Sequence, residues 1–497
     1  MKTSFLILVS LFLFTELNAQ FTLNLKGVES KTGKEIILKE IGKSSASEDA
    51  FWYVFIESAG ETKKYGFNEL KKYNFSVSNI KEFWQNQAVT NEVYESLTKF
   101  GPQYDLRREW EGEALQYLNE LEQRNLFFND SYLENYLYTI VYKLYPGSIN
   151  DGRPGIVNVK IMIDNTPNAF IFTNGTTIIT TGLLSTINSE EELIGIMAHE
   201  IAHFVLDHST ININKAIQRQ KNAEFWAAFA TTLAAAAEVY ASSQNEYYVP
   251  GALTYNTAIL SYSIANAFTE RLGLKYSREQ ELAADKCAVE LMKFLNVEPT
   301  ALASALIKIK NYCILSGNYF ALSGEGTHPG IQDRINKIGN TKEFSSKTYD
   351  KLISFVISTN AIIEFNNKHF DACNNLIERN INAGVPTEDD YILKAMTNLC
   401  LYNNTEKNTE NITLINKAKN LNIAPSVNLY KQEALAFIRL NKYPEALVSL
   451  QSYEDRLGEE YIKVDKIKNE YLWSSTIQYV ENELNWTKKM IYKVKSM

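Results

Sequence analysis

The apolar residues of this chain recur with two different periods, and each period predicts a different element. Over residues 130–146 they recur every three or four positions, the spacing of one helix face, at Leu133, Leu137, Ile140, Val141 and Leu144. Residues 157–163 alternate between apolar and polar types, as a half-buried strand does. The Asn-Gly pair at 174–175 lies between two apolar runs and predicts a β-hairpin beside that strand.

A further helix is predicted from Ser189, because a glutamate three residues later, Glu192, completes a capping-box pattern. This helix contains the pattern H-E-x-x-H at His199, Glu200 and His203. The two histidines are four residues apart and share one helix face, which is the geometry that two-histidine metal binding requires. Glu200 lies about 100° round the helix from the first histidine, where it can reach a water at the metal.

A catalytic zinc usually takes three protein ligands, and three residues are candidates for the third position. His208 lies nine residues after His199, so on one continuous helix it points about 180° away. His369 falls far along the chain and is interpreted as a surface or packing residue. Glu281 remains, and it shares a predicted helix face with Asp285, four residues later. A His-His-Glu set leaves a position for water, which is typical of a hydrolase.

Composition narrows the class of protein. The 497 residues are too many for one ordinary domain, and the net charge is −8 without a long basic block, so nucleic-acid binding is not expected. The chain has only five histidines, so a chance H-E-x-x-H match is expected on the order of once in several hundred such chains.

The N-terminus reads as a secretory signal peptide over residues 1–19, with Lys2 followed by a short apolar run and Ala19 at the expected cleavage site. A retained membrane anchor is the alternative. Export permits disulfides, and Cys373 with Cys400 is the candidate pair; four free thiols are the other interpretation. None of the four cysteines forms a C-x-x-C pair, which argues against a cysteine metal site.

The mature chain divides into three predicted parts. Residues 20–100 are expected to form a small β-rich module, because the run AFWYVFIES is rich in aromatic and branched residues. Residues 101–340 hold the metal motifs and a helical insertion at 209–276, whose Ala-rich helices are too weakly apolar to favour a membrane span; peripheral membrane contact stays open. Residues 345–497 are expected to form a helical array. Its similar stretches at 367–377 and 441–451 lie roughly two tetratricopeptide lengths apart and indicate repeats.

The segments HEIAH, SREQELAAD and THPGIQDR, in this order, resemble the gluzincin family that contains the CAAX prenyl proteases, HtpX and BepA. The resemblance covers about residues 130 to 340, and the helical repeats after it are similar to the BepA branch. It implies a mainly α chain with a small β-sheet in a zincin-like α+β unit. It also implies one zinc per chain, with His199, His203 and Glu281 as ligands and Glu200 as the general base.

The same resemblance implies roles for six other residues. Asp285 would orient a ligand histidine, and Arg334 would support His328 near the metal. His328 would either donate a hydrogen bond to the oxyanion or occupy the fourth zinc position as a latch. The edge strand that pairs with the substrate backbone would contain Asn168, Ala169 and Phe170.

These implications favour an exported zinc metalloendopeptidase of the periplasm or cell envelope, with membrane association as an open alternative. It would cleave unfolded or extended protein segments in envelope quality control, and its repeats would recruit a protein partner. The rival interpretation is a chaperone-like or scaffold protein with marginal proteolysis. The intact Glu200 argues against that rival, because a degenerate site would be free to lose its base.

Overall fold

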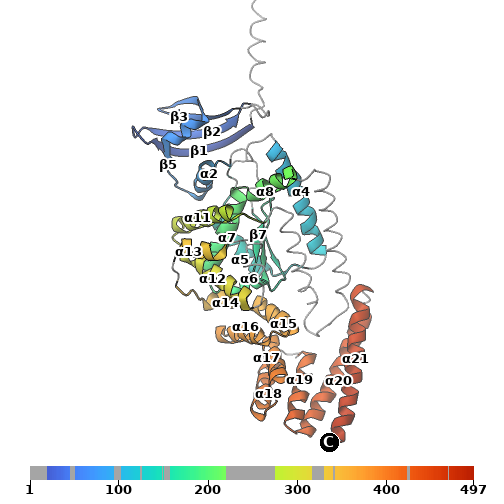
Figure 1. Cartoon of the computed structure of the whole chain (residues 1–497). Coiled ribbons are helices and arrows are strands. Elements are labelled where there is room, and N and C mark those ends of the chain that lie inside the picture. The colour runs from blue at the N-terminus through green and yellow to red at the C-terminus, as the bar shows by residue number, and fades with distance from the viewer. Residues whose placement is uncertain are drawn as a thin grey trace, which may run out of the picture.

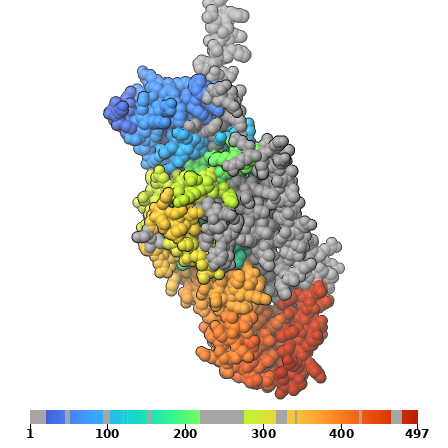
Figure 2. Space-filling view, viewed as in Figure 1, coloured from blue at the N-terminus to red at the C-terminus, as the bar shows by residue number. Residues whose placement is uncertain are grey.

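The structure is a computed structural model. It describes residues 19–44, 51–93, 102–123, 126–147, 149, 157–219, 275–315, 330–339, 342–421, 426–467 and 470–497. The expected mainly α fold with a small β-rich N-terminal module and a helical C-terminal array is confirmed. The β-rich module and the helical array lie at opposite ends of an elongated molecule, with an α+β body between them (Figures 1 and 2). The predicted signal peptide, His328 and most of the predicted insertion lie outside the described residues.

The N-terminal module is an antiparallel sheet of five strands in the order β4-β3-β2-β1-β5. The predicted aromatic strand is β3, whose inward residues Val54 and Ile56 are buried. The elements are β1 (Ala19–Glu29), β2 (Glu35–Lys43), β3 (Trp52–Ser58), β4 (Glu61–Gly66), the short 3₁₀ helix η1 (Phe67–Lys72), β5 (Tyr73–Phe75) and helix α2 (Ile80–Thr90).

Helix α2 joins this module to the body. The indole of Trp84 is fully buried and donates a hydrogen bond of 2.7 Å to the carbonyl of Leu144. The side-chain amide of Gln87 donates a hydrogen bond of 2.7 Å to the carboxylate of Glu290, which belongs to the body. Because both contacts join residues far apart in the sequence and the first is buried, α2 is packed firmly against the body.

The body contains a three-stranded sheet in the order β6-β8-β7. Its elements are α4 (Pro102–Gln123), α5 (Ser131–Leu144), β6 (Val159–Met162), β7 (Ala169–Ile171), β8 (Thr177–Thr180), α6 (Thr181–Thr186), α7 (Glu190–Val205), α8 (His208–Arg219), α11 (Arg278–Phe294), α12 (Thr300–Leu315) and α13 (Ile331–Ile338). The five apolar residues that predicted α5 are the five buried on it. The predicted hairpin is β7–β8, and Gly175 takes the left-handed φ of +82° that its turn requires.

Helix α7 begins as its sequence predicts. The Ser189 side chain accepts a hydrogen bond from the Glu192 amide, which is half of a capping box. The carboxylate of Glu192 instead accepts from the amide of Asn188 and pairs with Lys308 of α12. The start of α7 is therefore tied to α12, and the H-E-x-x-H turns lie in the centre of the body with α11 beside them (Figure 1).

The C-terminal array is a series of antiparallel helix pairs. It consists of α14 (Lys347–Leu352), α15 (Ser354–Asn366), α16 (Phe370–Ala383), α17 (Glu388–Leu401), α18 (Thr405–Lys419), α19 (Val427–Arg439), α20 (Tyr443–Ile467) and α21 (Glu470–Lys495). The first two helices pack into the central core, where Tyr349, Ile353 and Val356 lie among residues of the body. The packing therefore does not separate at residue 345, where the sequence suggests a new unit.

The two similar stretches of the array each form the turn between paired helices. The residue with left-handed φ in these turns is Lys368 in one and Asn441 in the other. The sequence alignment instead matches Asn367 with Asn441, so the structural match is shifted by one residue. As a result Cys373 and Ala446 occupy equivalent, fully buried positions at the start of α16 and α20.

The candidate disulfide is not formed. All four cysteines are free thiols; Cys373 is buried and Cys400 is exposed. The Cys373 thiol lies 3.8 Å from the hydroxyl of Thr397 on the neighbouring helix. Cys373 therefore serves as a buried packing residue and forms no disulfide. Among the described residues, no helix is long and apolar enough to cross a membrane.

Candidate metal centre

His199, His203 and Glu281 lie together at the centre of the body. Each offers one ligand atom, and the three atoms lie within 4.8 Å of one another. The Nε2 atoms of the two histidines are 3.0 Å apart, and the Glu281 carboxylate lies 3.5 Å from His199 Nε2 and 3.3 Å from His203 Nε2. The i, i+4 spacing on α7 and the packing of α11 against it bring the three together.

Helix α11 supplies Glu281 in its first turn, where the sequence predicts a helix start. Ser277 and Gln280 form a complete capping box there. The buried face of α11 then carries Glu281, Ala284, Asp285 and Ala288, so small residues allow close approach to α7. The helix therefore places two carboxylates, one turn apart, on the face that meets the histidines.

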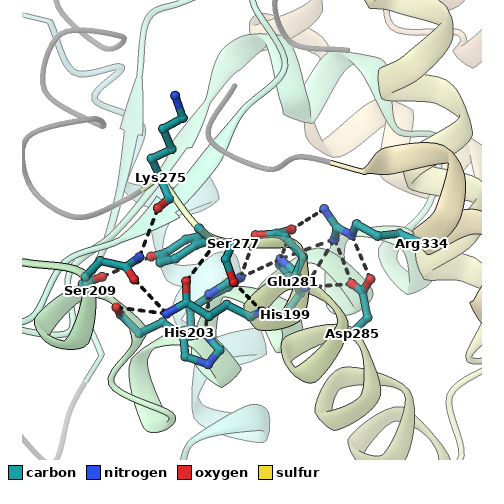
Figure 3. A network of polar contacts seen from close by, with 12 residues as sticks. His199, His203, Ser209, Lys275, Ser277, Glu281, Asp285 and Arg334 are labelled. Atoms are coloured by element: carbon teal, nitrogen blue, oxygen red, sulfur yellow. Dashed lines mark hydrogen bonds and ion pairs between the residues drawn. The ribbon is translucent and has the colours of Figure 1, made fainter. Parts of the chain in front are cut away.

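Asp285 and Arg334 form the polar layer behind the ligands. Asp285 Oδ1 lies 2.9 Å from His199 Nδ1, and Arg334 donates to both oxygens of Asp285 at 2.8 Å each. Arg334 Nη1 also lies 2.5 Å from Glu281 Oε2. Figure 3 shows Arg334 reaching from α13 towards both carboxylates. Asp285 thus lies against His199, the ligand histidine that the resemblance implies it would orient, whereas the implied support of His328 by Arg334 involves a residue outside the described ones.

Burial and charge set the protonation of these groups in the metal-free chain. Burial and Arg334 act to lower the pKa of His199, but the hydrogen bonds to Asp285 and Glu281 outweigh them and raise it to about 9. Burial acts to raise the pKa of Asp285, yet the neighbouring charge of Arg334 holds it below its usual value. A metal must displace the proton from His199, so metal binding releases it.

His208 is not where the sequence places it. Helix α7 ends at Val205, and Asp207 takes a left-handed φ of +53°, so the chain turns before α8 begins at His208. This turn brings His208 Nδ1 to 2.8 Å from His203 Nδ1. The expectation that His208 points about 180° away is wrong, because it assumed an unbroken helix. His208 meets the opposite ring nitrogen of His203, however, and not the group of three ligand atoms.

Neither this turn nor Tyr276 is among the features predicted from the sequence. The ring of Tyr276 stacks on His203 with centroids 3.6 Å apart. A signal for the turn was present in the sequence. Asp207 is a favoured N-cap residue, and its side chain accepts a hydrogen bond from the Thr210 hydroxyl at 2.8 Å in the first turn of α8. No sequence pattern pointed to Tyr276, because its contact with His203 depends on the tertiary fold and not on neighbouring residues.

Glu200 faces a cavity of about 90 Å³ beside the ligands. Glu200, His199 and Arg334 supply charged or polar groups to its lining, and Asn168 and Ala169 also line it. The remaining wall is largely apolar, with Leu183, Ile196, Leu306, Ile309, Cys313 and Ile331. Phe170 follows on β7 and is buried in the small core beneath α4. The structure thus brings the implied edge strand and the implied base to one cavity. His328 is outside the described residues.

A divalent metal fits this site. Two imidazoles and a carboxylate are characteristic zinc donors, and their close spacing suits one ion. The other ring nitrogen of each histidine has a buried polar partner, Asp285 for His199 and His208 for His203, as ligand histidines in proteins almost always do. These features together define a site for one divalent metal ion.

Comparison with known proteins points in the direction of the metalloproteases. The family model described as Peptidase family M48 matches residues 134–342, so this part of the chain is similar to that family. The mitochondrial metalloendopeptidase OMA1 of Schizosaccharomyces pombe is 27% identical over 180 residues, which are 36% of this chain and 45% of the relative. The chain therefore matches less than half the length of that relative.

Proposed function

We propose that the protein is a zinc-dependent metalloendopeptidase that cleaves unfolded or extended protein segments. The observation that carries the proposal is the convergence of His199, His203 and Glu281, with Glu200 beside them at a cavity bounded by an edge strand. The zinc, when bound, supplies Lewis-acid chemistry at neutral pH. The contact of Asp285 with His199, at 2.9 Å, supports the same proposal.

In this proposal Glu200 is the general base. Its carboxylate accepts a proton from the attacking water and then passes it to the nitrogen of the leaving amine. Glu200 follows His199 on α7, so its backbone is fixed by the same helix that fixes the ligands. It is 2% exposed, and burial in a low-dielectric site strengthens its interaction with developing charge.

The substrate is proposed to lie along β7. This strand is an edge strand of its sheet, and its first residue, Ala169, lines the cavity. Strand addition at such an edge recognises the main chain of an extended peptide and excludes folded segments. The apolar wall then favours an apolar side chain next to the bond that is cut.

The helical array is proposed to recruit a protein partner or substrate. Its first pair touches the substrate side of the body, because Glu364 of α15 accepts hydrogen bonds from Asn165 at 2.9 Å and from Tyr312 at 3.3 Å. Asn165 precedes the cavity residues Thr166 and Asn168, and Tyr312 precedes the cavity residue Cys313. A protein held by the array would thus be delivered close to the cavity. We also propose that the helices of the array are tetratricopeptide-like repeats.

We further propose that the protein is exported and acts in envelope protein quality control. The support is the signal-peptide pattern at residues 1–19 and the resemblance to envelope proteases. Peripheral membrane contact through the predicted insertion belongs to the same proposal. Cell fractionation with the N-terminal pattern intact and with residues 5–14 deleted tests it: export is expected only for the intact chain, and unchanged location would contradict it.

The enzymatic proposal is tested on the purified chain by metal analysis and casein cleavage. One zinc per chain and cleavage of casein are expected, with the cleavage lost after chelation and restored by added zinc. Folded proteins without extended segments should resist. A zinc-loaded chain that leaves casein intact would contradict the proposal.

A further inference from the structure

The two ring nitrogens of His203 lie in different environments. Nε2 faces Glu281 and His199 in the metal site, at 3.3 Å and 3.0 Å. Nδ1 faces the opposite way and lies 2.8 Å from Nδ1 of His208. Both rings are buried, so this contact is shielded from water.

The direction of this hydrogen bond follows from the role of Nε2. A neutral imidazole carries one proton, and a nitrogen that binds a metal must be the unprotonated one. If Nε2 of His203 serves the metal, its proton lies on Nδ1, and His203 is the donor. His208 Nδ1 is then the acceptor, and the proton of a neutral His208 lies on its own Nε2.

The surrounding contacts hold His208 in this place. Its backbone position is set by the turn at Asp207, whose carbonyl accepts the first helical hydrogen bond of α8 from Ile211. Tyr276 lies over the face of His203, and its hydroxyl is 3.1 Å from the hydroxyl of Ser209. Gln280 of α11 bonds to Asn212 of α8 at 2.9 Å. The starts of α8 and α11 therefore lie close together beside His203 (Figure 3).

We propose that His208 is a positioning residue for the metal ligand His203. Its imidazole accepts the Nδ1 proton of His203, which fixes the tautomer of that ligand and the direction of its Nε2. The two ligand histidines are thus supported differently, His199 by the carboxylate of Asp285 and His203 by a neutral ring. The inference rests on the proposed zinc site. Loss of such a supporting partner typically weakens metal affinity about 10- to 100-fold.

Three variants test it. His208→Phe keeps a ring of similar size and removes the acceptor. His208→Asn places an amide oxygen the same number of bonds from the backbone as Nδ1, so an acceptor is kept. His203→Ala removes the ligand itself. Zinc dissociation constants are measured by competition with a chromogenic chelator, and the visible spectra of the cobalt-substituted chains report the geometry at the metal.

For His208→Phe we expect zinc binding weaker by about 10- to 100-fold and an altered cobalt spectrum, and for His208→Asn recovery of most of both. A role in packing alone would give the opposite order, because Phe fills the space and Asn does not. Zinc affinity of His208→Phe equal to that of the parent, or of His208→Asn no better than that of His208→Phe, would overturn the proposal.

The readouts separate this inference from the proposed function. Zinc binding by the parent chain and its loss in His203→Ala test the metal site whether or not His208 matters. If the parent binds one zinc tightly and both His208 variants match it, only the positioning role fails. Near-ultraviolet circular dichroism of the metal-free chains shows whether each variant keeps its fold. A variant that binds zinc weakly with an unchanged metal-free spectrum supports the positioning role.

Discussion

Arg334 and Asp285 form a doubly hydrogen-bonded ion pair directly behind His199, a proposed metal ligand. Both bonds are 2.8 Å, and both side chains are buried. The same guanidinium reaches the ligand carboxylate of Glu281. The Arg334 cation therefore lies against two buried carboxylates at once.

Arg334→Met should destabilise the metal-free chain more than the zinc-bound chain. Removing the cation leaves Asp285 and Glu281 buried without its charge, and losses of about 3–5 kcal/mol are typical of such changes. Bound zinc supplies positive charge next to Glu281 and should recover part of the loss. Denaturant unfolding with and without zinc measures both values, and Arg334→Lys should fall between parent and Met because it keeps the charge but not the fork of donors. An equal loss in both metal states would contradict this account.

Gly182→Ala should displace the loop that borders the cavity. A Cβ at Gly182 would lie 2.3 Å from the carbonyl oxygen of Asn165, and this contact is to backbone, which cannot rotate away. Overpacking of this kind costs about 1–3 kcal/mol, and movement of Thr166 and Asn168 should also lower casein turnover. The matched control is Gly112→Ala on α4, where nothing lies within 4 Å and a gain of up to about 1 kcal/mol in helix propensity is expected. Similar effects of the two substitutions would refute the argument.

Much of the metal site follows from sequence because its geometry is local. The i, i+4 spacing of His199 and His203 and the capping signals at Ser189 and Ser277 depend on only a few neighbouring residues. The contact between His203 and His208 does not follow in this way. It depends on one residue with left-handed φ, Asp207. A prediction that continues the helix through Asp207 gives the later side chains, His208 included, the wrong direction.

The boundary between body and array could not be predicted either. Helices are alike in sequence whether they pack on the body or on a repeat, and only the partners of Tyr349 and Ile353 show that α14 and α15 belong to the central core.

Deletion of residues 345–497 should therefore leave a chain that does not fold. Deletion of residues 423–497 removes α19 to α21 and should keep cleavage of a short peptide while reducing cleavage of the native protein substrate. Equal activity of the shorter chain on both substrates would argue against recruitment by these helices.

Because of Asp389, the free energy of unfolding should decrease as the pH rises from about 4 to about 6. Burial, with added repulsion from Glu388 and Asp390, raises the pKa of Asp389 from 3.8 to about 6 in the folded chain. Over this pH window the unfolded chain has already lost the proton that the folded chain keeps, so the free energy of unfolding decreases as the pH rises. Asp389→Asn should therefore gain about 1–2 kcal/mol at pH 7, after allowance for the favourable helix N-terminus, and little at pH 4. Denaturant unfolding at both pH values checks this, and an equal gain at both would contradict it.

The central claim is that His199, His203 and Glu281 hold the metal while Glu200 moves the proton. The most direct measurement compares bound zinc and casein cleavage in Glu200→Gln and Glu281→Gln. Glu200→Gln should keep about one zinc and lose cleavage by 10²-fold or more, roughly the contribution of a general base, because only the proton acceptor is removed. Glu281→Gln should lose zinc itself. Retained cleavage by Glu200→Gln, or unchanged zinc content in Glu281→Gln, would contradict the account.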